Sequence, residues 1–391
     1  MSDFPETLPA AWWRSATTLE LVVKHYGSMR SAATATGSDR DNLRKWWKRH
    51  ELPPFQPDAP DVTPLEHLSQ PAPDGVDGEA LLAALRKAKE ATVPELADLL
   101  DTSPSRIRQA AERLRGEGYR IDLHEGGVRL ERIPPTKTTT HPDMLPLLDG
   151  KLMRIGVVSD THQSSRECAL DELHSAYDWF EREGVETVLH AGDWTCGRGI
   201  FRGQDSEIVR HTLDAQLEHL VWEYPQRAGV KTIGISGNHD LEGEAGRVGY
   251  DPVAALAARR SDIEYLGGYS AWVEVGSGQV DNAPYVHLLH GKGGMSYAYS
   301  YKAQKLVDGY PGGRKPAILI PGHWHVRAAF EARSVQVLFP GCFEWQSQFM
   351  QRLGLHPAVG FHLLEVVVGP DGSVVQFLPR WMRFYQGRVV G

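Results

Sequence analysis

Cysteines and long hydrophobic runs are both scarce in this sequence. Its 391 residues include only three widely spaced cysteines, Cys168, Cys196 and Cys342. An odd, scattered set argues against a disulfide framework and is typical of proteins in a reducing compartment. No apolar run approaches the roughly 20 residues that span a bilayer, and no apolar secretory segment follows Met1. We therefore expect a cytoplasmic protein without a membrane partner.

Basic residues are absent from one stretch, which predicts a linker. Between Glu51 and Glu79 there is no lysine or arginine, but there are seven acidic residues and seven prolines. A stretch of this composition cannot bury a core and is expected to be extended. The formal net charge of −8 does not favour a protein coated in nucleic acid, but the acidic linker hides a more basic segment before it.

The length and composition predict several folded units. Hydrophobic residues make up 41% of the chain and charged residues 24%, as in globular proteins, and 391 residues exceed one ordinary domain. We predict a helix-turn-helix-like unit at 1–52, the acidic linker at 53–78, a winged-helix-like unit at 79–133, a second linker at 134–150 and an α/β domain at 151–391. The sequence does not set the oligomeric state.

Residues 15–50 have the pattern of a small helical unit. Leu19, Val22 and Val23 recur at helical spacing, and a turn at Gly37 precedes a basic helix over residues 40–49. This order is typical of a helix-turn-helix. With Leu43 facing the core, six polar side chains would be free to meet DNA phosphates or base edges: Arg40, Asn42, Arg44, Lys45, Lys48 and Arg49. The alternative is a solvated charged helix on a three-helix bundle.

Residues 79–133 predict three helices and a hairpin. Leu81 marks the first helix, Thr92 opens the second and Ser103 the third, and two short alternating runs flank a turn at residues 125–126. This order resembles a winged helix, in which Arg106 and Arg108 of the third helix would contact DNA. Because that fold also serves protein–protein contacts, a scaffold role is the alternative.

The remaining residues alternate strands with helices. Strands are predicted at 154–159, 187–190, 231–236, 285–290, 317–321 and 335–339, helices at 171–183, 206–224, 252–259 and 301–307, and a closing hairpin at 361–368 and 373–378. Five short motifs follow these strands: Asp160-Thr161-His162, Gly192-Asp193, Gly237-Asn238-His239-Asp240, His290-Gly291 and Gly322-His323-Trp324-His325. Ligand sites in α/β sheets form at the carboxyl ends of strands. Carboxylate, amide and imidazole groups in this order therefore predict a site for divalent metals.

The five motifs together resemble the calcineurin-like metallophosphoesterase family over roughly residues 153–345. The resemblance implies a domain with two facing β-sheets flanked by helices. It implies that Asp160, His162 and His325 hold one metal ion, that Asn238, His290 and His323 hold another, and that Asp193 bridges the two. Two such ions stabilise both the entering and the leaving oxygen of a phosphoryl transfer. The ligands suit Mn²⁺ first, with Fe²⁺, Zn²⁺ and Ni²⁺ as alternatives.

Catalytic and substrate-contacting residues are also predicted. His239 would face the substrate in this resemblance and protonate the leaving oxygen, and Asp240 would orient its imidazole unless it is purely structural. Lys292 and Tyr297 lie in a segment rich in glycine, tyrosine and lysine that follows His290. This segment would grip a phosphodiester backbone or stack bases, unless it is an ordinary glycine loop leading into a helix.

The two halves of the chain together suggest a function. A phosphoester-cleaving centre tethered to two DNA-binding-like units predicts a DNA nuclease that cleaves phosphodiesters by a metal-bridged hydroxide, with DNA as its partner. The alternative is a small-molecule phosphodiesterase or phosphatase, acting for example on cyclic nucleotides, whose N-terminal units localise or regulate it. A third hypothesis, a transcription regulator with a degenerate phosphoesterase domain, is disfavoured by the complete ligand set.

Overall fold

The structure is a computed structural model that describes residues 76–88, 90–124, 127–131, 138–311, 314–385 and 388–390, with Leu19, Val22, Val23, Ala32 and Leu43. The chain divides into two units, Met1–Val62 and Thr63–Gly391. The five described residues of the first unit are helical and buried, in agreement with the predicted helical spacing. The rest of the predicted helix-turn-helix and the predicted linker up to residue 75 lie outside the described residues, as do the side chains predicted to contact DNA there: Arg40, Asn42, Arg44, Lys45, Lys48 and Arg49.

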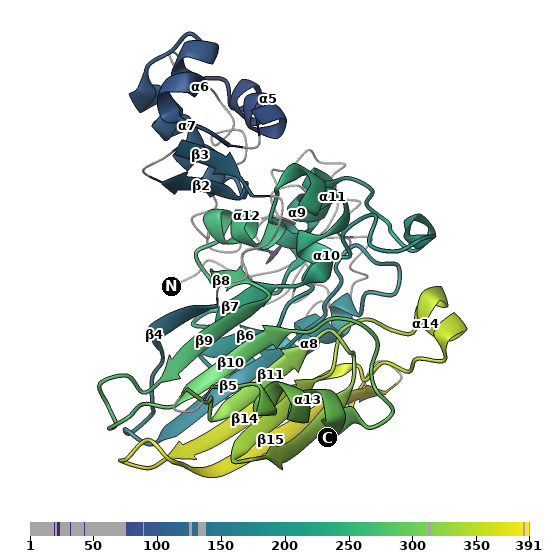
Figure 1. The fold of residues 1–391 in the computed structure, drawn as a ribbon. Helices are drawn as coiled ribbons and strands as arrows, with labels where there is room; N and C mark the ends of the chain where they lie inside the picture. Colours follow the sequence, from purple (N-terminus) through teal and green to yellow (C-terminus); the bar gives the residue numbers. More distant parts are fainter. Residues whose placement is uncertain are drawn as a thin grey trace. The chain divides into compact units, whose positions relative to one another are not determined.

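The second unit begins with three helices and a small sheet (Figure 1). The helices are α5 (Gly78–Ala88), α6 (Val93–Leu99) and α7 (Pro104–Gly116), and the antiparallel strands β1 (Glu90–Ala91), β3 (Gly127–Leu130) and β2 (Ile121–His124) pair in that order. A capping box begins α6: the Glu95 N–H donates to Thr92 Oγ1 over 3.3 Å, and the Thr92 N–H donates to Glu95 Oε2 over 2.8 Å. These elements enclose an apolar core of their own, and they follow the predicted order of three helices and a hairpin.

Two facing sheets form the rest of the unit (Figure 1). The seven-stranded sheet runs in the order β16 (Arg388–Val390), β15 (Val374–Tyr385), β14 (Gly360–Val368), β5 (Leu152–Val158), β6 (Thr187–His190), β7 (Lys231–Ser236) and β8 (Ile263–Gly268). The six-stranded sheet runs in the order β12 (Arg327–Ala332), β13 (Val335–Pro340), β11 (Ile318–Gly322), β10 (Tyr285–His290), β9 (Ser270–Val275) and β4 (Thr139–Leu145). Apolar side chains from both sheets, among them Ile155, Ile233, Val286 and Ile320, make one buried core, which supplies most of the driving force for folding.

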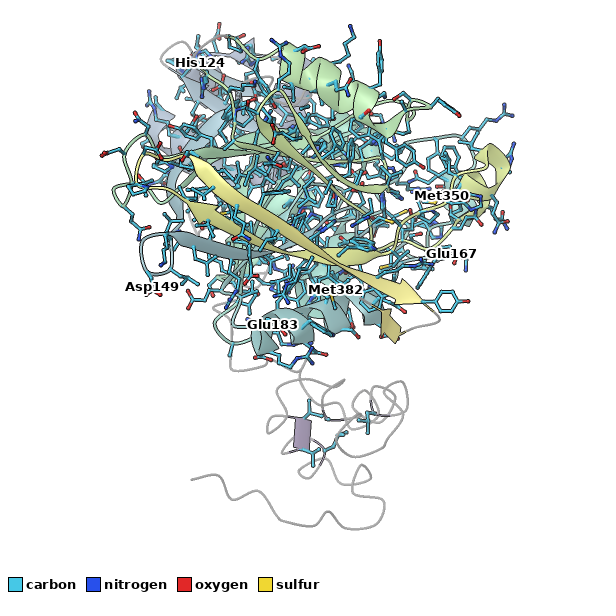
Figure 2. All side chains as sticks on the ribbon, turned by 90° about the horizontal axis from the view of Figure 1, so that it is seen from below. His124, Asp149, Glu167, Glu183, Met350 and Met382 are labelled. Atoms are coloured by element: carbon cyan, nitrogen blue, oxygen red, sulfur yellow. The ribbon has the colours of Figure 1, made fainter. Side chains whose placement is uncertain are left out.

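Helices cover the outer faces of the sheets. Helix α8 (Leu170–Arg182) packs on the seven-stranded sheet, where Phe180 meets Phe361 of β14 edge to face at 5.0 Å. Glu183, just after α8, lies 3.6 Å from Arg380 of β15, and Figure 2 shows Glu183 and Met382 of β15 on the same side of the molecule. Helix α13 (Tyr299–Asp308) covers the other sheet with Ala303 and Val307. The remaining helices are α9 (Leu213–Glu223), α10 (Asn238–Leu241), α11 (Gly243–Val248), α12 (Pro252–Arg259) and α14 (Gln348–Leu353), with a 3₁₀ turn, η2 (Gln204–Ser206).

The predicted strands and closing hairpin are confirmed, but other segments differ from the prediction. The helix predicted over 206–224 begins only at Leu213, where the Thr212 side chain caps it. The stretch 134–150 was predicted as a connector, whereas residues 139–145 form β4, which pairs with β9 at the edge of the six-stranded sheet. Strands β8, β9 and β12 were not predicted. Among the described residues, no helix is long and apolar enough to span a membrane.

Candidate metal centre

The predicted ligands lie on loops at the carboxyl ends of five strands. Asp160 follows β5, Asp193 follows β6 and Asn238 follows β7, whereas His290 ends β10 and His323 follows β11. Because the first three strands belong to one sheet and the last two to the other, the centre lies between the two sheets at one end. This is the edge at which parallel strands place functional groups.

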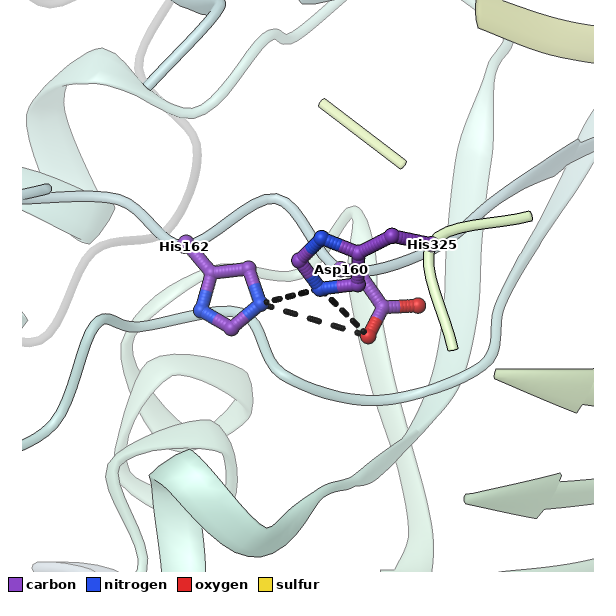
Figure 3. A group of neighbouring side chains, drawn as sticks. All are labelled: Asp160, His162 and His325. Carbon is purple, nitrogen blue, oxygen red and sulfur yellow. Dashed lines mark hydrogen bonds and ion pairs between the residues drawn. The ribbon is translucent and has the colours of Figure 1, made fainter. Parts of the chain in front are cut away.

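Asp160, His162 and His325 form the first cluster (Figure 3). His325 Nε2 lies 3.0 Å from His162 Nε2 and 3.4 Å from Asp160 Oδ1. The Asp160 carboxylate is fixed from behind, because the His323 N–H donates to both of its oxygens over 3.0 and 3.1 Å and Ser159 Oγ donates over 2.5 Å. Two ring nitrogens and a carboxylate oxygen therefore converge on one point.

Asp193, His290 and His323 form the second cluster, which Asn238 joins. His290 Nε2 lies 3.1 Å from Asp193 Oδ2 and 3.2 Å from Asn238 Oδ1, and the His290 Nδ1–H donates to the Ala191 carbonyl over 2.8 Å. That bond fixes the ring so that Nε2 faces the cluster. Asp193 Oδ2 also lies 3.7 Å from His162 Nε2, so one carboxylate faces both clusters, as expected of a bridging group.

The backbone of the site is held in an uncommon conformation. Five of the predicted ligands, Asp160, His162, Asp193, His323 and His325, have positive φ angles between 38° and 89°. Such conformations cost of order 1–3 kcal/mol for each non-glycine residue and persist only when the surrounding structure imposes them, which is typical of functional sites. Local backbone propensity therefore does not explain these φ angles. They are explained by the need to bring the ligand side chains together at one place.

Burial and mutual charge set the protonation of the ligands. Burial, helped by the neighbouring His239, lowers the pKa of His162 well below its usual value, so the ring is neutral. Burial would raise the pKa of the two aspartates, but His290 holds the pKa of Asp193 well below its usual range, and His325 lowers that of Asp160 to about 2. Both aspartates are therefore carboxylates, and a buried set of carboxylate, amide and imidazole donors fits divalent cations.

Two glycines let these groups approach. A Cβ atom added to Gly237 would lie 2.2 Å from Asp193 Oδ1 and 2.7 Å from His290 Cε1. A Cβ atom on Gly192 would lie 2.4 Å from His290 Nδ1, and its φ of +98° favours glycine independently. The absence of a side chain at these two positions therefore leaves room for Asp193 and His290.

His239 and Asp240 have different surroundings. The half-buried His239 ring lies edge to face on His162, with centroids 4.5 Å apart, and its Nδ1–H donates to the Cys196 carbonyl over 2.7 Å. Asp240 was predicted to orient this imidazole, but its oxygens instead accept the N–H groups of Gly237, Trp194 and Thr195 over 2.9–3.1 Å. The orienting contact is thus made by Cys196, and Asp240 ties the Asp193 loop to the Asn238 loop.

Glu344 is a site residue that the sequence prediction missed. Its Oε2 lies 4.0 Å from His162 Nε2 and 3.9 Å from His325 Nδ1, and Ser165 Oγ donates to its Oε1 over 2.6 Å. Glu344 follows β13, a strand of the six-stranded sheet that was predicted from the sequence. No ligand was predicted at the carboxyl end of this strand, although the acidic residue there could have indicated one.

The predicted substrate-contacting segment is fixed to the centre through Trp324. Trp324 lies between two predicted ligands, and its Nε1–H donates to the Gly293 carbonyl over 2.8 Å, while Lys302 Nζ lies 4.9 Å from its ring centroid. Lys292 is exposed, and the Tyr297 side chain is fully exposed. Lys302 therefore contacts the loop between the predicted ligands His323 and His325.

Comparison with known proteins identifies the family. The Calcineurin-like phosphoesterase superfamily domain matches residues 153–355, more than half of the chain. The chain belongs to this superfamily. With the carboxylate and imidazole clusters in place, it is a metal-dependent phosphoesterase, a hydrolase whose centre suits two metal ions.

Two curated proteins and two solved structures are also similar to parts of the chain. The DNA polymerase II small subunits of two strains of Halobacterium salinarum are 32% identical over 99 residues, which are 24% of this chain and 20% of those proteins. The chain thus matches about a fifth of their length. A novel archaeal phosphodiesterase (18% identity, TM-score 0.32) and Vps29 with Zn²⁺ from Entamoeba histolytica (17%, 0.29) each align with 59% of the chain, over 100% and 99% of their own lengths. The likenesses to these two solved structures carry no argument about function.

Proposed function

We propose that this calcineurin-like phosphoesterase is a DNA nuclease. The observation that carries the proposal is the pairing of the phosphoesterase centre with helix α7, on which Arg106 and Arg108 are exposed on either side of the buried Ile107. Among the described residues, neither arginine has a carboxylate partner. The similarity of a short stretch to DNA polymerase II small subunits supports a nucleic-acid substrate.

In this proposal seven side chains hold the metals. Asp160, His162 and His325 would hold one cation, Asn238, His290 and His323 the other, and Asp193 both. Two bound cations, with Mn²⁺ the first choice, would activate water and stabilise the charge that develops on the phosphoryl oxygens.

The other residues of the site position groups and move a proton. The Cys196 carbonyl accepts the Nδ1–H of His239, so that in the imidazolium form the Nε2–H would be the one given to the leaving oxygen. The His239 N–H donates to Asp193 Oδ1 over 2.8 Å, which couples the position of the acid to that of the bridging carboxylate. Exact placement of such groups is what sets the rate in hydrolytic centres.

The test uses the full chain loaded with Mn²⁺ on linear and supercoiled DNA and on bis(p-nitrophenyl) phosphate. Wild type is expected to cleave both kinds of substrate, Asp193→Asn to cleave neither, and the exposed control Glu181→Gln to match wild type. Hydrolysis of the aryl diester or of a cyclic nucleotide without any DNA cleavage would sink the nuclease proposal and leave the small-molecule phosphodiesterase in its place.

A second test examines α7. The double variant Arg106→Gln/Arg108→Gln should raise the KM for DNA and lower the slope of log KM against log salt by up to about two, because each lost phosphate contact removes about one unit. Hydrolysis of the aryl diester should not change. Lys87→Gln, on helix α5, is the matched charge control. Equal salt slopes for the double variant and wild type would remove α7 from DNA binding.

A further inference from the structure

A pocket of about 610 Å³ lies where the first residue of β12 meets the last residues of β15. Five of its lining residues are aromatic or basic and have polar or ring surface to offer: Arg327, Trp345, Trp381, Arg383 and Tyr385. We call these residues the Trp381 pocket. Its volume falls within the range of pockets that bind small organic ligands, and it is large enough for one nucleotide unit.

The chain connects this pocket directly to the metal centre. Arg327 comes two residues after the predicted ligand His325, so at most about 7 Å separates their Cα atoms. Trp345 follows Glu344, whose carboxylate lies 3.9 Å from His325 Nδ1. Ala358, which also lines the pocket, donates its N–H to the His325 carbonyl over 2.8 Å. The backbone that lines the pocket is therefore hydrogen-bonded to the backbone of a predicted metal ligand.

The two arginines of the pocket are exposed and lack acidic partners. Within the part of the chain that the structure describes, neither Arg327 nor Arg383 has a carboxylate within 4.0 Å. Arg380, three residues before Arg383 on β15, lies instead 3.6 Å from Glu183 and 3.8 Å from Glu365. Arg327 lies near the buried His362 ring, whose pKa is lowered to about 3 by burial and, to a smaller extent, by this guanidinium. Two unpaired guanidinium groups suit an anion, and their planar forks match phosphate oxygens.

The aromatic side chains of the pocket are rigidly supported. The Trp381 ring packs so closely on backbone that a Cβ atom on Gly341 or Gly360 would lie 2.6 or 2.8 Å from it. Its other neighbour is His362, with ring centroids 4.8 Å apart. Tyr385 is more than half exposed and has the Arg383 guanidinium 5.8 Å from its ring centroid. Aromatic rings fixed in this way stack an unpaired base without a large cost in side-chain entropy.

We propose that the Trp381 pocket binds one nucleotide of a single-stranded nucleic-acid substrate, with its base on Trp381 and Trp345 and its phosphate on Arg327 and Arg383. The proposal rests on the proposed nuclease function. A base can reach an indole ring only when it is neither paired nor stacked in a duplex, so the pocket selects strand ends or single strands.

The experiment uses the metal-loaded full-length chain and a deoxythymidine tetranucleotide with phosphorothioate linkages, which keep the backbone charge and resist hydrolysis. Isothermal titration gives the Kd for wild type, for Arg327→Gln/Arg383→Gln, for Trp381→Phe and for the matched control Arg380→Gln. The double variant should raise the Kd at least tenfold and Trp381→Phe about threefold, whereas Arg380→Gln should stay within twofold of wild type. All four chains should keep the same Tm.

The proposal is overturned if wild type does not bind the tetranucleotide, if the double variant binds it as tightly as wild type, or if inorganic phosphate binds with the same Kd. These results are distinct from failure of the nuclease function. A chain that cuts DNA while its double variant keeps the wild-type Kd refutes the pocket alone, and a chain that binds the tetranucleotide but cuts no DNA refutes the nuclease alone.

Discussion

Replacing Gly237 by alanine tests how closely the two strand-end loops must approach each other. The added Cβ would lie 2.2 Å from Asp193 Oδ1 and 2.5 Å from the Asp193 backbone nitrogen. Ordinary van der Waals contact begins at about 3.4 Å, so the Asp193 carboxylate must retreat by about 1 Å. Gly237 has a φ of −111°, which alanine adopts without strain, and the effect therefore comes from the collision alone.

A displacement of 1 Å at a catalytic group lowers kcat by about 100-fold, and overpacking a close-packed site costs about 1–3 kcal/mol of stability. The assay is hydrolysis of bis(p-nitrophenyl) phosphate with saturating Mn²⁺, together with the Tm of the same preparations. Gly116→Ala is the matched control, because a Cβ added to this glycine of α7 meets no atom within 4 Å. A Gly237→Ala chain with kcat within twofold of wild type would refute the close approach of these loops.

Three further predictions concern Asp240, the metal ions and two buried histidines. Asp240→Asn should lower the free energy of unfolding by about 1–3 kcal/mol and reduce kcat, because the amide N–H₂ would face backbone N–H groups that now donate to the carboxylate. Chemical denaturation, with the exposed Asp205→Asn as the control, checks this prediction. Equal stability of Asp240→Asn and wild type would contradict it. Chelation should lower the Tm, since metals at about 1,000 times their Kd add about 4 kcal/mol; a Tm unchanged by EDTA and Mn²⁺ would refute metal loading. Burial lowers the pKa of His287 from 6.5 to about 4 and that of His362 to about 3, so each contributes stability that is complete above pH 6.5 and is lost, by up to roughly 3 kcal/mol, as the pH falls to 4. His362→Leu should flatten this loss in urea titrations, and an unchanged pH slope would contradict it.

The metal ligands could be predicted from the sequence because each lies within a few residues of a strand end. The rule that parallel strands bring their carboxyl ends together places Asp160 near Asp193. His290 belongs to the other sheet and was assigned to the set through the resemblance to the calcineurin-like family. The contacts of Asp240 could not be predicted in this way. Its place four residues after Ser236, the last residue of β7, does not indicate that the backbone N–H groups of Trp194 and Thr195 donate to its carboxylate. Those partners lie more than 40 positions away, and only the fold brings them together.

Strands with mixed or interrupted patterns escaped prediction for a related reason. Strand β8 ends in Gly267 and Gly268, which weaken a strand pattern. Strand β4 is polar over Thr139, Thr140 and His141, and its pairing with β9 is decided by burial of Leu145 in the shared core. Edge strands of this kind depend on tertiary packing more than on their own β-propensity.

The most direct test of the two-metal centre is anomalous diffraction from crystals of the full chain soaked in Mn²⁺. The account predicts two peaks, one in contact with Asp160, His162 and His325 and the other with Asn238, His290 and His323, both within reach of Asp193. Peaks at other side chains, or none at these ligands in a chain that still hydrolyses phosphodiesters, would contradict it.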